Sequence, residues 1–144
     1  ESYGLKSSIE DITQWMYINM DSNTVKSNTL RKGITLSQLG YYYSENKIYQ
    51  GLGWEMYDYP VNEELVIRNS SNDVALLAKE IQEVKPEHMD GRQLFIHKTG
   101  ATNGFGAYVA FIPSEKIGIV MLANKNFPNA ERVKAAFAIL NALH

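Results

Sequence analysis

Residues 93–123 read QLFIHKTGATNGFGAYVAFIPSEKIGIVMLA, and this stretch decides the fold. It contains three runs rich in apolar, β-branched and aromatic residues, each long enough for a strand: 93–98, 105–112 and 117–123. Asn103-Gly104 is a strong signal for a β-hairpin turn, and Pro113-Ser114-Glu115 turns the chain into the third run. Successive strands joined by short turns pair in antiparallel fashion, so the stretch predicts a three-stranded antiparallel sheet.

Helical patterns flank this sheet on both sides in the sequence. Upstream, Ser7 or Ser8 can cap a helix over about 8–20, and a second pattern, interrupted by Gly33, runs from Leu30 to about Tyr43. Downstream, Asn129 opens a helix with one apolar face, formed by Val133, Ala136, Phe137, Leu140 and Leu143. This order predicts an α+β fold with N-terminal helices and with the C-terminal helix packed on the sheet.

The middle of the chain gives weaker signals. The aromatic run from Lys47 to Tyr59 predicts one strand with a bulge or a close backbone approach at Gly51 and Gly53. Residues 61–90 show little periodicity, and we interpret them as a long, partly irregular surface excursion. Loops of that length in a compact domain are usually functional or mobile.

Composition narrows the possible functions. The chain has 144 residues, a hydrophobic fraction of 44%, a charged fraction of 21% and a formal net charge of -2, which favour a soluble domain over a nucleic-acid or membrane-surface binder. It has no apolar run of membrane-spanning length and no cysteine. His88, His97 and His144 lack metal-ligand spacing, so no metal ion or other cofactor is expected.

The chemistry centres on Lys98-Thr99-Gly100 at the end of a predicted strand. The lysine can neutralise a carboxylate, the threonine can donate a hydrogen bond, and the glycine lets a ligand lie close along the backbone. Backbone N–H groups just after it could point at a developing oxyanion. As a bare tripeptide, it is better explained as a solvated lysine followed by a turn glycine.

The flanking sequence makes this tripeptide specific. Residues 97–113 read HKTGATNGFGAYVAFIP, and residues 119–132 read IVMLANKNFPNAER. This combination resembles the third active-site element and following hairpin of class C β-lactamases. The resemblance extends to Tyr3-Gly4-Leu5-Lys6, to YQGLGWE at 49–55 and to the terminal helix at 133–143. It implies the β-lactamase/transpeptidase-like fold and residues 1–144 as a C-terminal segment of the catalytic domain.

The resemblance also implies a role for each matching residue. Lys98 would support acylation and hold the substrate acid, Thr99 would hydrogen-bond that acid, and Ala101 beside Gly100 would give a backbone N–H to the oxyanion hole. The substrate-binding residues would be Tyr3, Asn126, Asn129 and Arg132, with Arg132 as charge support behind the others. The stretch 74–84 would border the leaving-side substituent. Simpler roles stay open: Asn126 and Asn129 could cap the last helix, and Tyr3 could be ordinary surface.

Acyl transfer to serine also needs a nucleophile and a base. In the family these come from an upstream Ser-x-x-Lys and a Tyr-x-Asn. Two local stretches fit these patterns: Ser44 to Lys47 and Tyr17 to Asn19. We interpret both as chance matches, because Ser44 does not lie at the start of an apolar helix and Tyr17 lies inside a predicted helix. The parent enzyme is therefore expected to hydrolyse β-lactams through an acyl-serine, and this segment alone is expected to be inactive.

The same resemblance predicts the partners. The substrate would be a β-lactam, and the N-terminal part of the same enzyme would complete the sheet. The resemblance also implies that the enzyme works in the periplasm. Without that part, an unpaired strand edge and an apolar face would promote self-association. Three alternatives remain: a D-alanyl-D-alanine peptidase or esterase of the same superfamily, a non-catalytic binding module for acidic ligands, and a purely structural fragment.

Overall fold

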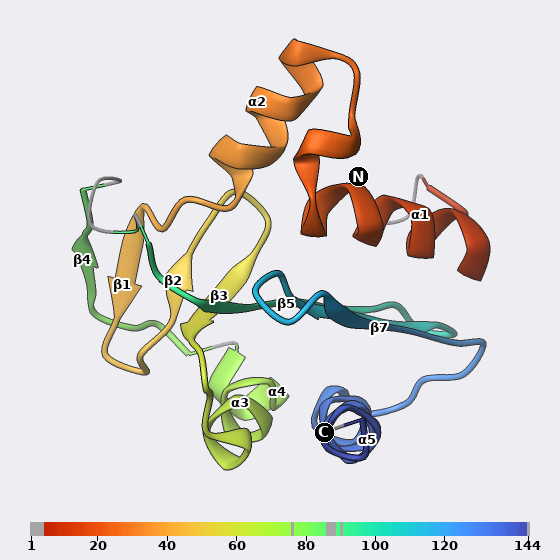
Figure 1. Ribbon diagram of the computed structural model, residues 1–144. Coiled ribbons are helices and arrows are strands. Elements are labelled where there is room, and N and C mark those ends of the chain that lie inside the picture. Colours follow the sequence, from red (N-terminus) through yellow and green to blue (C-terminus); the bar gives the residue numbers. More distant parts are fainter. Residues whose placement is uncertain (1–4, 76, 86–88, 90, 144) are drawn as a thin grey trace.

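The computed structural model describes residues 5–75, 77–85, 89 and 91–143 of the chain. Its centre is a seven-stranded antiparallel sheet in the order β4-β1-β2-β3-β5-β6-β7, with helices on both faces (Figure 1). The strands are β1 (Tyr42–Ser44), β2 (Tyr49–Gln50), β3 (Glu55–Asp58), β4 (Ile81–Glu83), β5 (Leu94–Ala101), β6 (Gly106–Ile112) and β7 (Ile117–Ala123). The α+β class is confirmed, but the prediction of a three-stranded sheet was wrong.

The three long strands lie where the sequence predicts them. β5 and β6 are joined by the hairpin that contains Asn103-Gly104, and Thr102 N–H donates to the Phe105 carbonyl at 2.9 Å to close it. β6 and β7 pair along their whole length, from Gly106 opposite Ala123 to Ile112 opposite Ile117. Short local turns therefore determine this part of the sheet.

One face of the sheet packs against α1 (Ile9–Met20). Ser8 caps this helix, because its hydroxyl accepts a hydrogen bond from Asp11 N–H at 3.2 Å. Met16 points at β7, where a side-chain carbon on Gly118 would lie only 2.7 Å from the Met16 sulfur. The glycine thus permits the close approach of helix and sheet. Buried residues of this layer are Met16, Tyr49, Trp54, Met56, Met89, Ile96, Val109 and Phe111.

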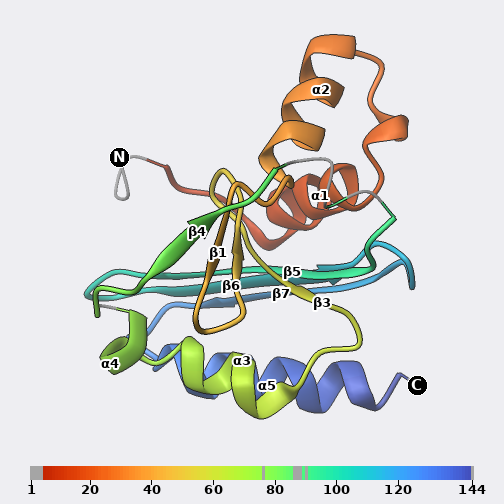
Figure 2. The same ribbon diagram turned by 90° about the vertical axis from the view of Figure 1, so that its left-hand side faces the viewer.

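The opposite face packs against α5 (Asn129–Asn141), which runs beside α3 (Glu63–Asn69), as two views at right angles show (Figures 1 and 2). Phe95 stacks on Phe137 of α5 with ring centroids 5.2 Å apart. Side chains alternate along β5: Phe95 and His97 belong to this layer, whereas Ile96 belongs to the other. All of these side chains are buried, so the central strands have a core on each side.

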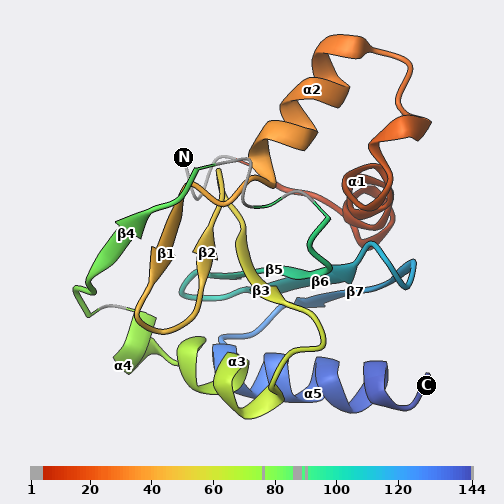
Figure 3. The same ribbon diagram turned by 60° about the vertical axis from the view of Figure 1, so that its left-hand side comes forward.

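Two further expectations were wrong, and a third was incomplete. The second helix, α2 (Asn28–Ser37), ends before Tyr43, which lies in β1 instead. Residues 47–59 form two strands, β2 and β3, with Gly51 N–H donating to the Trp54 carbonyl at the connection. Residues 61–90 include α3, α4 (Asn72–Ala75) and β4, which lies beside β1 (Figure 3). Gln82 of β4 pairs with Tyr43 of β1. The pairings β1–β4 and β3–β5 join segments that lie far apart in the chain, and local periodicity does not report them.

Candidate active site

The residues singled out from the sequence gather at one end of the sheet. Strand register places Ala101, at the end of β5, opposite Gly106, and Gly106 opposite Ala123, at the end of β7. The connection from β7 to α5 and the first turn of α5 follow directly. The structure therefore brings Lys98, Thr99, Gly100 and Ala101 to the same end as Asn126, Asn129 and Arg132.

Lys98 makes an ion pair with Glu55, a residue that sequence reasoning missed. Its Nζ donates to Glu55 Oε1 at 2.8 Å, and the lysine side chain is still 44% exposed. Burial alone would raise the pKa of the Glu55 carboxyl, but the positive charge of Lys98 holds that pKa below its ordinary value. Glu55 thus fixes a charged lysine that can still reach a ligand.

His97 is fully buried beneath this pair. Burial lowers the pKa of its imidazole to about 4, although Glu55 opposes that shift. Its Nε2 lies 3.7 Å from Glu55 Oε2, which is a contact and not a hydrogen bond. Because His97 is uncharged at neutral pH, the positive charges that act on Glu55 are those of Lys98 and, to a smaller extent, Lys79. The rings of Tyr57, Phe95 and Tyr108 surround the imidazole.

Arg132, in the first turn of α5, is 1% exposed. Its Nη1 donates to the carbonyls of Gly100 and Ala107 at 2.6 and 2.7 Å, and its Nη2 donates to Asn129 Oδ1. Burial lowers the pKa of the guanidinium, which nevertheless stays charged. A buried cation therefore lies directly behind the Lys98-Thr99-Gly100 strand.

Asn129 does not cap its helix by a side-chain hydrogen bond, because α5 begins after Pro128 without one. Its Oδ1 accepts from Arg132, and its Nδ2 lies 3.5 Å from Asn72 Oδ1 at the start of α4. Asn72 was not singled out from the sequence, because only the packing of α4 near α5 brings it here. The side chain of Asn129 thus joins Arg132 to the segment that follows α3.

The remaining candidates are less constrained. Asn126 lies exposed in the connection between β7 and α5, Thr99 is half-buried, and Ala101 is exposed at the end of β5. Tyr3 lies outside the described residues. Of the stretch 74–84, β4 is exposed along its whole length.

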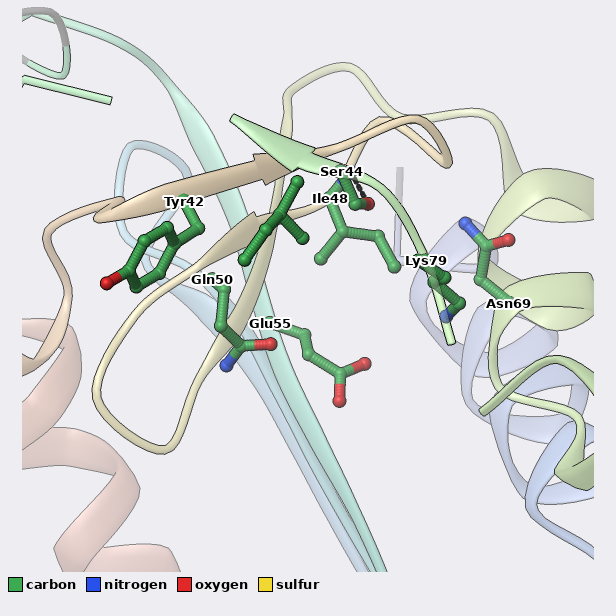
Figure 4. A pocket seen from close by; sticks show the side chains of 8 residues that line it. Tyr42, Ser44, Ile48, Gln50, Glu55, Asn69 and Lys79 are labelled. Carbon is green, nitrogen blue, oxygen red and sulfur yellow. Dashed lines mark hydrogen bonds between the residues drawn. The ribbon is translucent and has the colours of Figure 1, made fainter. Parts of the chain in front are cut away.

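A cavity of about 220 Å³ lies between the β1–β2 hairpin, β4 and α3 (Figure 4). Glu55 and Lys79 contribute opposite charges to its lining, and Ile48 and Ile81 contribute apolar surface. The figure shows the Glu55 carboxylate directed towards the side where Lys79 and Asn69 lie. The carboxylate that pairs with Lys98 is therefore also part of a cavity wall.

The two local matches to nucleophile motifs lie in unsuitable places. Ser44 ends β1, and its hydroxyl oxygen accepts from Ile48 N–H at 3.3 Å, in a tight turn instead of at a helix start. Tyr17 and Asn19 both lie in α1, where Tyr17 is 59% exposed and Asn19 is buried. Asn19 Nδ2 donates to the Trp15 carbonyl at 2.8 Å. Neither pair of side chains forms a catalytic arrangement with Lys98 in the structure.

No helix in the described part of the chain is long and apolar enough to cross a membrane. Within the same residues, no group of three or more histidine, cysteine, aspartate or glutamate side chains is arranged to hold a metal ion.

Comparison with known proteins identifies the family. A family model described as beta-lactamase matches residues 1–144. The chain is 50% identical to a beta-lactamase of Escherichia coli strain K12 over 143 residues, which are 99% of this chain and 38% of that protein. It is 48% identical to a beta-lactamase of Yersinia enterocolitica over 145 residues, which cover 99% of this chain and 37% of that relative.

Comparison of the fold with solved structures points to the same family. The fold matches the crystal structure of a class C beta lactamase from Rhodobacter sphaeroides with a TM-score of 0.88 and 31% sequence identity, over 98% of this chain and 39% of that one. The chain belongs to the beta-lactamase family, and its relatives include class C members. It spans less than two-fifths of the length of the relatives just described.

Proposed function

We propose that this chain is the C-terminal, substrate-binding part of a class C serine β-lactamase. The intact protein would hydrolyse the amide bond of cephalosporins and penicillins. A serine hydroxyl, supplied outside this chain, would attack the β-lactam carbonyl, the ring C–N bond would break, and the nitrogen would take a proton. Water would then cleave the acyl ester, release the acid and restore the serine.

The single observation that carries this proposal is the charged, half-exposed Lys98 held by Glu55 at the end of β5. The ion pair holds the ammonium in position without burying it. A substrate carboxylate can accept hydrogen bonds from Lys98 and from the Thr99 hydroxyl beside it. Asn126 and Asn129, at the same end of the sheet, would complete the recognition of that acid.

The other parts of the site take roles that follow from their places. Ala101, exposed just beyond Gly100, would give its backbone N–H to the oxyanion. Tyr3 would form a wall for the acyl side chain, and the stretch 74–84 would border the leaving-side substituent. The nucleophile and base would come from the N-terminal part of the same enzyme, and the resemblance to this family supports a periplasmic location for the whole.

Replacement of Lys98 in the intact protein tests the proposal. Lys98→Ala removes a charge-assisted hydrogen bond worth about 1.5–3 kcal/mol, so we expect kcat/KM for a cephalosporin to fall about tenfold to a hundredfold. Lys134→Ala, which removes an exposed lysine of α5, is the matched control and should leave kcat/KM unchanged. Equal activity of Lys98→Ala and wild type, or faster turnover of a D-alanyl-D-alanine peptide than of the cephalosporin, would contradict the proposal.

A further inference from the structure

The interaction between Arg132 and the β5–β6 hairpin involves two carbonyls on neighbouring strands. Gly100 and Ala107 are register partners, and one guanidinium nitrogen of Arg132 donates to both of their carbonyl oxygens. Among the described residues, the hydrogen-bond partners of this guanidinium are neutral oxygen atoms, including Asn129 Oδ1. The positive charge is therefore applied to backbone peptide groups and not to a carboxylate.

Strand pairing determines the direction of the Ala101 N–H group. Thr102 N–H donates to the Phe105 carbonyl, and hydrogen-bonded pairs alternate along an antiparallel ladder. Gly100 and Ala107 are consequently a hydrogen-bonded pair, whereas Ala101 and Gly106 are not. The Ala101 N–H therefore points away from β6. On that side β3 no longer pairs with β5, because the register between the two strands ends at His97 opposite Glu55.

The Gly100 carbonyl and the Ala101 N–H belong to the same planar peptide unit. In a trans peptide the two groups point in opposite directions, so a cation bound to the Gly100 oxygen holds the plane in which strand pairing already directs the Ala101 N–H outward. Polarisation of the carbonyl also strengthens the N–H as a hydrogen-bond donor. Arg132 can thus act on the site from behind, although its own side chain is buried.

Gly106 makes room for this arrangement. A side-chain carbon at position 106 would lie 2.6 Å from Arg132 Nη1 and 2.9 Å from its central carbon. These distances are shorter than real contacts, so any other residue would displace the guanidinium. Gly106 is itself buried, and the strand could accommodate another residue there only if Arg132 moved.

We propose that Arg132 is a positioning residue that holds the Gly100–Ala101 peptide in the plane set by strand pairing and polarises it, and that Gly106 is the residue that admits the guanidinium. The inference rests on the proposed function, because it treats Ala101 N–H as an oxyanion donor. It also differs from the role that the resemblance implies for Arg132, namely charge support for the substrate acid. An oxyanion donor acts in the transition state, whereas a ligand of the substrate acid acts equally in the bound substrate.

The two roles separate in steady-state kinetics of the intact protein. For Arg132→Met we expect kcat to fall about tenfold to a hundredfold with little change in KM, less than the loss from deleting an oxyanion donor outright. Arg132→Lys should recover part of this loss, because a point charge can reach one carbonyl but not bridge both in the same geometry. Lys134→Met on the exposed side of the same helix is the control and should match wild type.

Gly106→Ala provides an independent test that keeps the charge of Arg132. We expect it to lower kcat in the same direction as Arg132→Met, and the double variant to be little worse than either single one, because both changes act on one contact. If Arg132→Met fails to fold, as judged by circular dichroism, Gly106→Ala and Arg132→Lys still distinguish the two roles of Arg132. Both variants should lower kcat with little change in KM.

Infrared spectroscopy gives a readout that overall stability would not move. In the acyl-enzyme, a weaker oxyanion donor raises the stretching frequency of the ester carbonyl, so Arg132→Met and Gly106→Ala should both shift it upward. A raised KM with unchanged kcat and unchanged carbonyl frequency would overturn the inference and make Arg132 a ligand of the substrate acid. Absence of β-lactam hydrolysis by the wild-type intact protein would instead contradict the proposed function itself.

Discussion

Lys98, Glu55 and His97 show how neighbouring residues divide the charge at this end of the sheet. Glu55 carries the negative charge, Lys98 carries the positive one, and His97, fully buried, carries none at neutral pH. The lysine could be singled out from the sequence because the residues that flank its tripeptide are distinctive. The glutamate could not, because its position depends on the register of β3 against β5, which no local pattern reports.

The lowered pKa of His97 predicts a loss of stability in acid. The unfolded chain binds a proton at His97 near pH 6.5, whereas the folded chain does so only near pH 4. Stability is therefore fully present above pH 6.5 and falls as the pH is lowered towards 4. The loss at pH 4 is about 3 kcal/mol in free energy of unfolding.

Urea unfolding of wild type and His97→Asn at pH 7 and pH 4 measures this effect. The wild type should lose about 3 kcal/mol more than the variant between the two pH values, because only the wild type has this histidine to protonate. Equal acid sensitivity of the two proteins would show that His97 is not the buried neutral group described above.

At the scale of elements, local signals and distant pairing contribute differently. Ser8 and the Asn103-Gly104 turn act on adjacent backbone, so α1, β5, β6 and β7 follow from the sequence with small errors at their ends. β1, β2 and β4 are only two or three residues long. β2 pairs with its neighbours β1 and β3, whereas β1 and β4 pair with each other from segments far apart in the chain. Tyr42, for example, pairs with Glu83, and the short segments give no periodicity from which this could be predicted.

The cap of α1 gives a prediction at this scale. Ser8→Ala removes the acceptor for Asp11 N–H, so we expect a loss of about 1 kcal/mol in the free energy of unfolding. Ser7→Ala, at the exposed neighbouring position, is the matched control and should change stability by much less. Chemical denaturation of both variants compares them directly, and an equal loss in both would mean that Ser8 is not the cap.

In the molecule as a whole, β7 lies at the end of the strand order and pairs only with β6 among the described strands. Its sequence, IGIVMLA, contains no charge and no proline. Such an edge promotes pairing with another chain. The exposed Phe105 and Leu122 add apolar surface near it. In the intact protein, the N-terminal part of the enzyme would cover this edge.

We therefore predict that the 144-residue chain, produced alone, associates with itself through β7. Leu122→Lys introduces a charge on this strand, where Leu122 is 42% exposed, and should shift sedimentation profiles towards monomer. Leu143→Lys, at an exposed position beyond the end of α5, is the control and should associate like wild type. Monomeric wild type at all concentrations would contradict the prediction.

Some residues of the candidate site could be predicted from the sequence, and others are found only in the structure. Lys98, Thr99 and Ala101 came from the sequence, and the structure adds Glu55 and Asn72 as contacts of Lys98 and Asn129. Gly106 was also missed, because its importance depends on the distance to a side chain on α5. The sequence shows which residue types are present, whereas close contacts such as that between Gly106 and Arg132 depend on how separate elements pack together.

Intact-mass spectrometry after incubation with a penicillin tests the central claim most directly. The intact protein should gain the mass of one penicillin, because an acyl-serine retains every atom of the opened ring, and Lys98→Ala should acquire this mass more slowly. The 144-residue chain alone is expected to gain no mass, because the proposed function places the attacking serine outside this chain. A stable adduct on the isolated chain would contradict the account.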